Sequence, residues 1–107
     1  MPDILDKIFC DKKIELDTVK RKLALPDVKM RIANNNYEIR EIRMLLESTT
    51  RSFIFTEIKP RTPFKGELLK NFDPVDLAKT YADNGASALS ILTESSYFGG
   101  SLSTLEK

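Results

Sequence analysis

Histidine is absent from the 107 residues of this chain, and cysteine occurs only once, as Cys10. Without histidine, the chain lacks the side chain that most often acts as a general base near neutral pH and most often binds metal ions. A single cysteine cannot form a disulfide within the chain, which favours a reducing, intracellular setting. We interpret Cys10 as a small hydrophobic residue buried on a helix.

Long hydrophobic runs are missing as well, and neither sign of charge prevails. No apolar stretch approaches the roughly 18 residues that a membrane-spanning helix needs, and the opening MPDILDKIF is too acidic for a signal peptide. The 17 basic and 16 acidic residues leave a net charge of +1, which provides no electrostatic footprint for nucleic acid or an anionic membrane. We therefore expect one cytoplasmic domain that binds neither nucleic acid nor membranes.

The first half of the chain has the apolar spacing of helices. Asp3 is a candidate N-cap for a first helix, whose pattern runs as far as Pro26, a residue that ends helices. Asp27 is a candidate cap for a shorter helix, which stops at the polar run of residues 34–36. A third helix is predicted from Tyr37, because apolar residues follow it at helical spacing.

The period changes from helix to strand in the second half. Residues 53–58, FIFTEI, alternate their faces as a strand does. Asp73 followed by Pro74 marks a helix start, and Gly85 marks its end. Residues 88–93, ALSILT, predict a second strand. This spacing is typical of a βαβ unit with parallel neighbouring strands, so we predict an α/β fold.

Two opposite charges, Glu57 and Lys59, stand on one face of the first predicted strand, because side chains alternate with period two. Ile58 belongs to the other, buried face. Both faces of a parallel sheet are covered, so charges on one of them are unfavourable unless they line a site. The pair is therefore either a structural ion pair or the charged part of an active site in a dry cavity.

The second predicted strand and the loop after it supply further candidates, because sites in parallel α/β folds lie beyond the carboxyl ends of the strands. Ser90 and Leu92 lie on the face expected to meet the charged pair, and Phe98 is placed to cover it from the loop. The simpler interpretation makes Ser90 and Leu92 core residues and Phe98 a packed loop aromatic. Arg61 and Lys65 are interpreted as solvated loop charges.

Three stretches of the chain stand in an order that is typical of one family. They are EIKPRTPFKG at residues 57–66, LSILTE at residues 89–94 followed by YFGGS at residues 97–101, and the opening PDILDKIFCDKKIEL. The first resembles the first-strand motif of indole-3-glycerol-phosphate synthase, which is close to E-x-K-x-x-S-P-S-K-G. The second resembles the second-strand motif of this family, and the opening is similar to the extra helix before its barrel. The resemblance covers essentially the whole chain.

The resemblance implies a (β/α)8 TIM barrel preceded by extra N-terminal helices. Residues 1–50 correspond to the helical extension, and residues 51–107 to the first two strands and the first helix of the barrel. The implied activity is that of a carboxy-lyase in tryptophan biosynthesis. It closes the indole ring of 1-(2-carboxyphenylamino)-1-deoxyribulose 5-phosphate with loss of carbon dioxide and water, and it uses neither a cofactor nor a metal.

The motif positions also imply residue roles. The two catalytic positions are matched by Glu57 and Lys59. The lysine is expected to meet the anionic groups of the substrate and to support acid–base steps, and the glutamate to orient that lysine and the anilino end. The positions that bind the phosphorylated substrate are matched by Glu57, Lys59, Ser90, Leu92 and Phe98. The motif departs from the family at Pro60, Thr62 and Phe64, so we expect a loop of different mobility.

A barrel of this class needs about 250 residues, whereas this chain stops before the third strand. In the family that strand carries the lysine that acts as general acid, and later strands carry a further glutamate and the phosphate-binding loops. We therefore expect a fragment that is inactive by itself and associates through its unpaired strand edges. The alternative is a non-catalytic interaction module made of the helices and the βαβ unit. The related isomerase of the same pathway fits these motifs less well.

Overall fold

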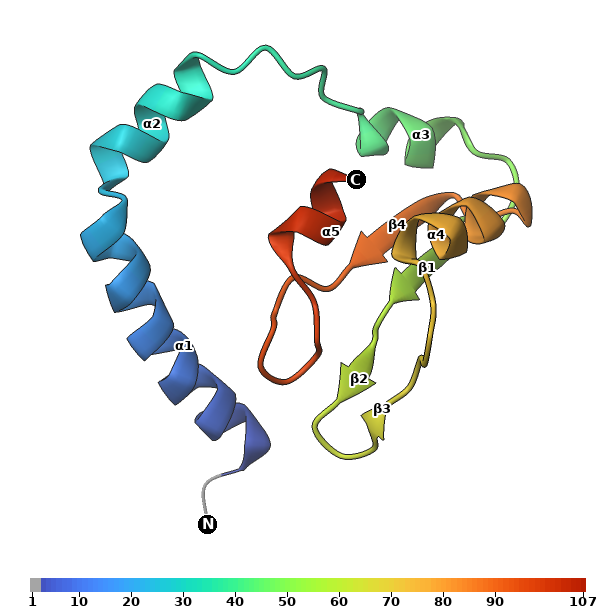
Figure 1. Ribbon diagram of the computed structural model, residues 1–107. Helices are drawn as coiled ribbons and strands as arrows, with labels where there is room; N and C mark the ends of the chain where they lie inside the picture. Colours follow the sequence, from blue (N-terminus) through green and yellow to red (C-terminus); the bar gives the residue numbers. More distant parts are fainter. Residues whose placement is uncertain (1–2) are drawn as a thin grey trace. The chain divides into compact units, whose positions relative to one another are not determined.

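The computed structural model describes residues 3–107 of the chain. Contacts divide the chain into two units, Met1–Arg40 and Glu41–Lys107. Figure 1 shows the elements of both. The first unit contains α1 (Ile4–Lys22) and α2 (Leu25–Ala33). The second contains the remaining elements: α3 (Ile42–Ser48), β1 (Phe55–Ile58), β2 (Arg61–Thr62), β3 (Gly66–Glu67), α4 (Pro74–Asp83), β4 (Ala88–Ile91) and α5 (Leu102–Glu106).

Helix α1 begins at the predicted cap. The Asp3 carboxylate accepts a hydrogen bond from the Leu5 amide, and the Asp6 carboxylate accepts one from the Asp3 amide at 3.2 Å, which completes a capping box. Three basic residues in the last turn, Lys20 to Lys22, oppose the negative end of the helix dipole. The helix therefore starts where the sequence predicts, but it ends at Lys22, before the predicted end at Pro26.

Helix α2 corrects two predictions. It begins at Leu25 after an Ala24 cap that has no side-chain hydrogen bond, so Pro26 lies inside its first turn and Asp27 is not the cap. Proline fits a first turn because the amide it lacks has no partner there.

The prediction that Cys10 is buried is also wrong, because Cys10 on α1 is exposed. Neither α1 nor α2 buries a residue, because no other element packs over their apolar faces within this unit.

The second unit confirms the predicted βαβ arrangement. Strands β1 and β4 pair in parallel with Glu57 opposite Ser90, and α4 connects them and contacts β1 (Figure 1). The Asp73 carboxylate caps α4 by accepting hydrogen bonds from the amides of Val75 and Asp76 at 2.8 and 3.1 Å. This local cap and the proline after it explain why the helix starts where the sequence predicts.

Two details of this unit differ from the predictions. The third helix begins at Ile42 rather than at Tyr37. The segment after β1 contains a small antiparallel hairpin, β2 with β3, which the prolines in this segment concealed. Gly66 has a φ of 68°, the left-handed conformation that glycine adopts easily. Ser101 caps the short α5, with its hydroxyl accepting from the Thr104 amide.

The core of the second unit lies on one side of its two-stranded parallel sheet. Ile58 is 1% exposed and is the one large hydrophobic side chain that is fully buried within residues 3–107. This agrees with the prediction for Ile58, whereas Ile54, predicted on the same inner face, is 50% exposed. Many other large apolar side chains, such as Phe55 and Ile54, remain exposed. None of the helices within residues 3–107 has the length and apolar content needed to span a membrane.

Candidate active site

Glu57 and Lys59 form an ion pair where β1 ends. The Lys59 Nζ atom lies 2.8 Å from Glu57 Oε2. Strand alternation brings the two side chains to one face, with Ile58 between them pointing the other way. Their side chains are 36% and 40% exposed, so the pair does not lie in the dry cavity that the sequence suggested. Water and small solutes can reach it.

Ser90 joins this pair from the neighbouring strand. The parallel register sets Ser90 opposite Glu57, and its hydroxyl donates a hydrogen bond to Glu57 Oε1 at 3.1 Å. The hydrogen bond from Lys59 lowers the pKa of Glu57 below its ordinary value of 4.5. Partial burial opposes this effect, while the Ser90 hydrogen bond and the Lys59 charge add to it. Glu57 is therefore held as a carboxylate with both oxygens engaged.

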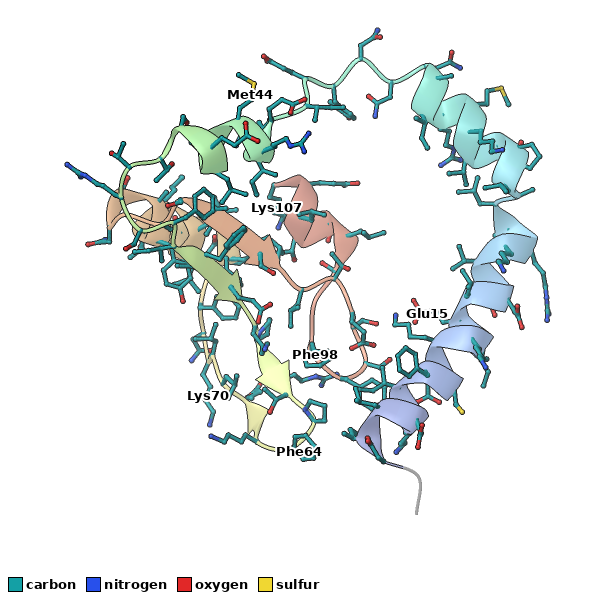
Figure 2. All side chains as sticks on the ribbon, turned by 180° about the vertical axis from the view of Figure 1, so that it is seen from behind. Glu15, Met44, Phe64, Lys70, Phe98 and Lys107 are labelled. Atoms are coloured by element: carbon teal, nitrogen blue, oxygen red, sulfur yellow. The ribbon has the colours of Figure 1, made fainter. Side chains whose placement is uncertain are left out.

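Phe98 reaches the same pair from the loop after β4. Its ring centroid lies 5.9 Å from Lys59 Nζ, within the range of a cation–π contact. Figure 2 labels Phe98 on this loop and Phe64 in the β2–β3 hairpin, where Phe64 is exposed. The structure thus brings together Glu57, Lys59, Ser90 and Phe98, which come from two segments more than 30 residues apart in the sequence.

Leu92, the fifth predicted residue, lines a small cavity instead. This cavity has a volume of about 140 Å³, and Ile58 and Ile91 line it as well. Leu92 directly follows the last residue of β4. Its part in binding substrate remains a prediction.

Sequence reasoning missed two charged residues next to this group. Arg61, which we interpreted as a solvated loop charge, binds the backbone of the loop after β4, and its Nε atom is buried. Glu94 accepts hydrogen bonds from the amides of Ser96, Tyr97 and Phe98 in the same loop. The familiar turn signals of Asp, Asn, Ser and Thr do not cover a glutamate, so no local pattern marked Glu94. No local pattern marked Arg61.

Comparison with known proteins identifies the family. The family model described as "Indole-3-glycerol phosphate synthase" matches residues 5–107. The chain belongs to the indole-3-glycerol phosphate synthase family. The recognition made from the three sequence motifs is thereby confirmed, and the family is a TIM barrel. The small parallel sheet and its crossover helix are consistent with a part of such a barrel.

Curated members of the indole-3-glycerol phosphate synthase family align with almost the whole chain. The synthase of Microcystis aeruginosa is 37% identical over 103 residues, which cover 96% of this chain and 35% of the relative. The synthase of Roseiflexus sp. is 38% identical over 107 residues, with 99% and 39% covered. That of Campylobacter fetus is 39% identical over 99 residues, with 92% and 38% covered. The chain thus spans between a third and two fifths of the length of these synthases.

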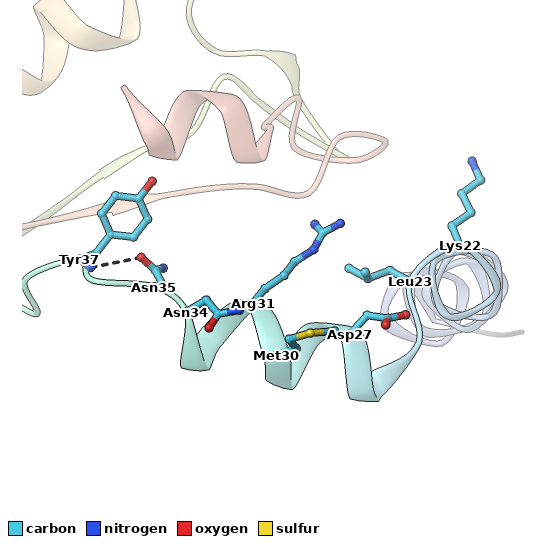
Figure 3. Close-up of a pocket in the computed structure, with 8 residues that line it drawn as sticks. All are labelled: Lys22, Leu23, Asp27, Met30, Arg31, Asn34, Asn35 and Tyr37. Carbon is cyan, nitrogen blue, oxygen red and sulfur yellow. Dashed lines mark hydrogen bonds between the residues drawn. The ribbon is translucent and has the colours of Figure 1, made fainter.

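A second hollow lies within the first unit, beside α2 (Figure 3). It has a volume of about 670 Å³ and is lined by Lys22, Leu23, Asp27, Met30, Arg31, Asn34, Asn35 and Tyr37. The amide of Tyr37 donates to Asn35 Oδ1 at 3.1 Å. The side chains of Lys22 and Arg31 extend outward in Figure 3 and do not converge on one point.

Proposed function

We propose that this chain supplies the first two strands and the first helix of an indole-3-glycerol-phosphate synthase barrel. Residues 51–107 form this part, and residues 1–50 form the helical extension before the barrel. The reaction is ring closure of 1-(2-carboxyphenylamino)-1-deoxyribulose 5-phosphate, with loss of carbon dioxide and water, in the cytoplasm. The match of the family model to residues 5–107 supports the assignment.

One observation carries the catalytic part of the proposal. Glu57 and Lys59 form an ion pair at the carboxyl end of a parallel strand, and Ser90 and Phe98 converge on it. Sites in parallel α/β folds lie at this end of the strands. The cation of Lys59 is held by a carboxylate and still has solvent access, so an anionic group of a substrate can approach it.

The pair has separate tasks in this scheme. Lys59 meets the anionic groups of the substrate and moves protons, because an ammonium group donates up to three hydrogen bonds. Glu57 orients Lys59 and the anilino end, because both of its oxygens already hold neighbouring donors. Leu92 and Phe98 provide apolar surface for the aromatic ring of the substrate. No cofactor is required in this scheme.

The reaction needs more than this chain supplies. Ring closure requires a proton donor at the carbonyl, a base for the step that restores aromaticity, and a seat for the phosphate. Each acid or base that acts in such a step contributes about 10² to 10⁴ in rate. We therefore propose that residues 1–107 alone form no measurable product and that activity requires the remaining barrel strands.

The test compares two proteins in a fluorescence assay for indole-3-glycerol phosphate. One is residues 1–107 alone, and the other is the same residues joined to the part of the Roseiflexus synthase that follows the matched region. We expect product only from the hybrid, and none from a hybrid that carries Glu57→Gln and Lys59→Ala. Product from residues 1–107 alone, abolished by the same two changes, contradicts the proposal. So does an inactive hybrid that unfolds cooperatively.

Exposed apolar side chains favour a second candidate, an interaction module that associates with itself. Phe55 is 58% exposed on a two-stranded sheet whose outer edges pair with no strand within residues 3–107. Such edges and apolar groups promote association. We infer that residues 1–107 form dimers or larger species in solution. Light scattering that shows a compact monomer contradicts this inference.

A further inference from the structure

The loops that follow β1 and β4 are tied together beside the ion pair. We name them the β1 loop (residues 59–73) and the β4 loop (residues 92–101). Because β1 and β4 are parallel neighbours in register, both loops leave the sheet at the same end. The conformation of the β4 loop therefore affects the position of Phe98 relative to Lys59.

The β4 loop is first folded by its own acidic residue. Glu94 Oε1 accepts from the Ser96 amide at 2.9 Å, and Glu94 Oε2 accepts from the amides of Tyr97 and Phe98 at 2.6 and 3.0 Å. The Gly100 amide donates back to the Glu94 carbonyl at 2.7 Å. A carboxylate that binds three successive amides confines the loop to a tight turn.

Arg61 then fastens this turn to the β1 loop. Its Nη2 atom donates to the carbonyl oxygens of Ser95, at 2.9 Å, and of Ser96. Its amide donates to the Phe98 carbonyl at 3.2 Å. One residue of the β1 loop thus makes three hydrogen bonds to the β4 loop, on either side of Tyr97. A planar guanidinium group is suited to binding neighbouring carbonyls in this way.

Gly99 permits this close approach, because a β-carbon on it would lie 3.3 Å from Arg61 Cγ. Gly100 serves the turn itself, since a β-carbon there would collide with the Leu92 carbonyl oxygen of the same loop. Gly99 also has a φ of 69°, in the left-handed region that favours glycine. The backbone of the β4 loop therefore lies directly against the methylene groups of Arg61.

We propose that Arg61 is a positioning residue, which ties the β4 loop to the β1 loop and thereby holds the Phe98 ring against Lys59. The Phe98 amide is bound by Glu94, and the Phe98 carbonyl is bound by the Arg61 amide. These two hydrogen bonds fix the backbone from which the ring projects, and the ring centroid lies 5.9 Å from Lys59 Nζ. Arg61 Nε is buried without a hydrogen-bond partner. We call the hydrogen bonds from Arg61 to the β4 loop the clamp. An unpaired buried donor lowers the net stabilisation that the clamp provides, which favours a positioning role for Arg61 over a role in stability alone. The kinetic part of this proposal rests on the proposed function.

The clamp itself is tested by hydrogen exchange on the full chain, with no activity needed. Arg61→Met keeps the methylene packing against Gly99 and the backbone hydrogen bond to Phe98, and it removes the guanidinium donors to Ser95 and Ser96. We expect amide exchange in residues 96–100 to rise about tenfold, while strands β1 and β4 exchange as before. Arg61→Lys, which keeps the charge and one donor group, should recover part of the protection. The matched control is Arg43→Met, the same change at an exposed arginine paired only with Glu47 on α3.

Two results overturn the clamp. One is exchange in residues 96–100 that is the same in Arg61→Met as in Arg43→Met. The other is exchange that rises equally in β1 and β4, because it assigns Arg61 to the stability of the whole unit. If Arg61→Met does not fold, the exchange of Arg61→Lys and of Glu94→Gln tests the clamp instead. The first weakens the hydrogen bonds from the β1 loop, and the second weakens the turn of the β4 loop that accepts them. Protection that is unchanged in both variants also overturns it.

The link to Lys59 is tested by a double-mutant cycle in the active hybrid. We expect Arg61→Met to lower kcat about tenfold with KM changed less than about threefold, because it displaces a group near the chemistry. If Arg61 acts through Phe98, adding Phe98→Leu produces no further loss. Additive losses overturn the link. A confirmed clamp in an enzyme whose Lys59→Ala variant keeps full activity refutes the proposed function and leaves the clamp standing.

Discussion

The chain contains two ion pairs with nearly the same geometry. On α1, Lys12 Nζ lies 2.6 Å from Glu15 Oε2, with side chains 39% and 52% exposed. At the end of β1, Lys59 Nζ lies 2.8 Å from Glu57 Oε2, with side chains 36% and 40% exposed. The first joins residues three apart on the surface of a single helix. The second receives a hydroxyl and an aromatic ring from β4 and its loop.

The comparison shows that distance and exposure alone do not distinguish a site from a surface pair. An exposed pair of the α1 kind contributes about 0 to 1 kcal/mol, and helix geometry alone is enough to form it. The β1 pair depends on contacts across more than 30 residues of sequence. Groups brought together from distant segments are what mark Glu57 and Lys59 as a candidate site.

The largest expected difference between the pairs is in catalysis. In the active hybrid, Lys59→Ala should lower kcat/KM by about 10² to 10⁴, since it removes a proton-transfer group from the site. Lys12→Ala removes the same charge from the α1 pair and should change kcat/KM less than about twofold. Steady-state kinetics with circular dichroism as a folding control measure both. Equally small changes in kcat/KM in the two variants would show that the β1 pair is only a structural ion pair.

The next effect concerns stability. Ile58→Ala should lower the free energy of unfolding of the hybrid by about 2 to 5 kcal/mol, because it leaves a cavity in place of a fully buried side chain. Ile32→Ala makes the same change on α2, where the side chain is 68% exposed, and should cost about 0.5 kcal/mol or less. Urea denaturation provides both values. A large loss from Ile32→Ala would show that another part of the barrel covers α2.

The smallest effect is on titration. The Lys59 hydrogen bond lowers the pKa of Glu57. Stability from the pair is therefore present above the ordinary pKa and is lost as the pH falls through the lower folded value. In Lys59→Met the pKa of Glu57 should rise, whereas Lys12→Met should leave it where it is. Carbon-detected NMR titration of the Glu57 carboxyl group measures the change. An unmoved pKa in Lys59→Met would mean that the pair does not persist in solution.

Local signals in the sequence predicted much of the fold. The caps at Asp3 and Asp73 and the helix stop near Gly85 depend on side chains and backbone conformations within a few residues, so they are readable from the chain. The parallel pairing of β1 and β4 followed from the length of the crossover. The period-two pattern also predicted that Ile58 would be buried and that Glu57 and Lys59 would share a face.

The tertiary structure alone decided the remaining features. Spacing identifies the apolar face of a helix but not whether another element covers it, which is why Cys10 proved exposed. Strand register sets which residue of β4 faces Glu57, and it brought the Ser90 hydroxyl to the carboxylate. Arg61 binds carbonyls 34 and 35 residues away, and backbone carbonyls carry no sequence signature. By itself the sequence determined the caps of α1 and α4, the parallel strand pair and the family, and only the packing of two distant loops decided what surrounds Lys59.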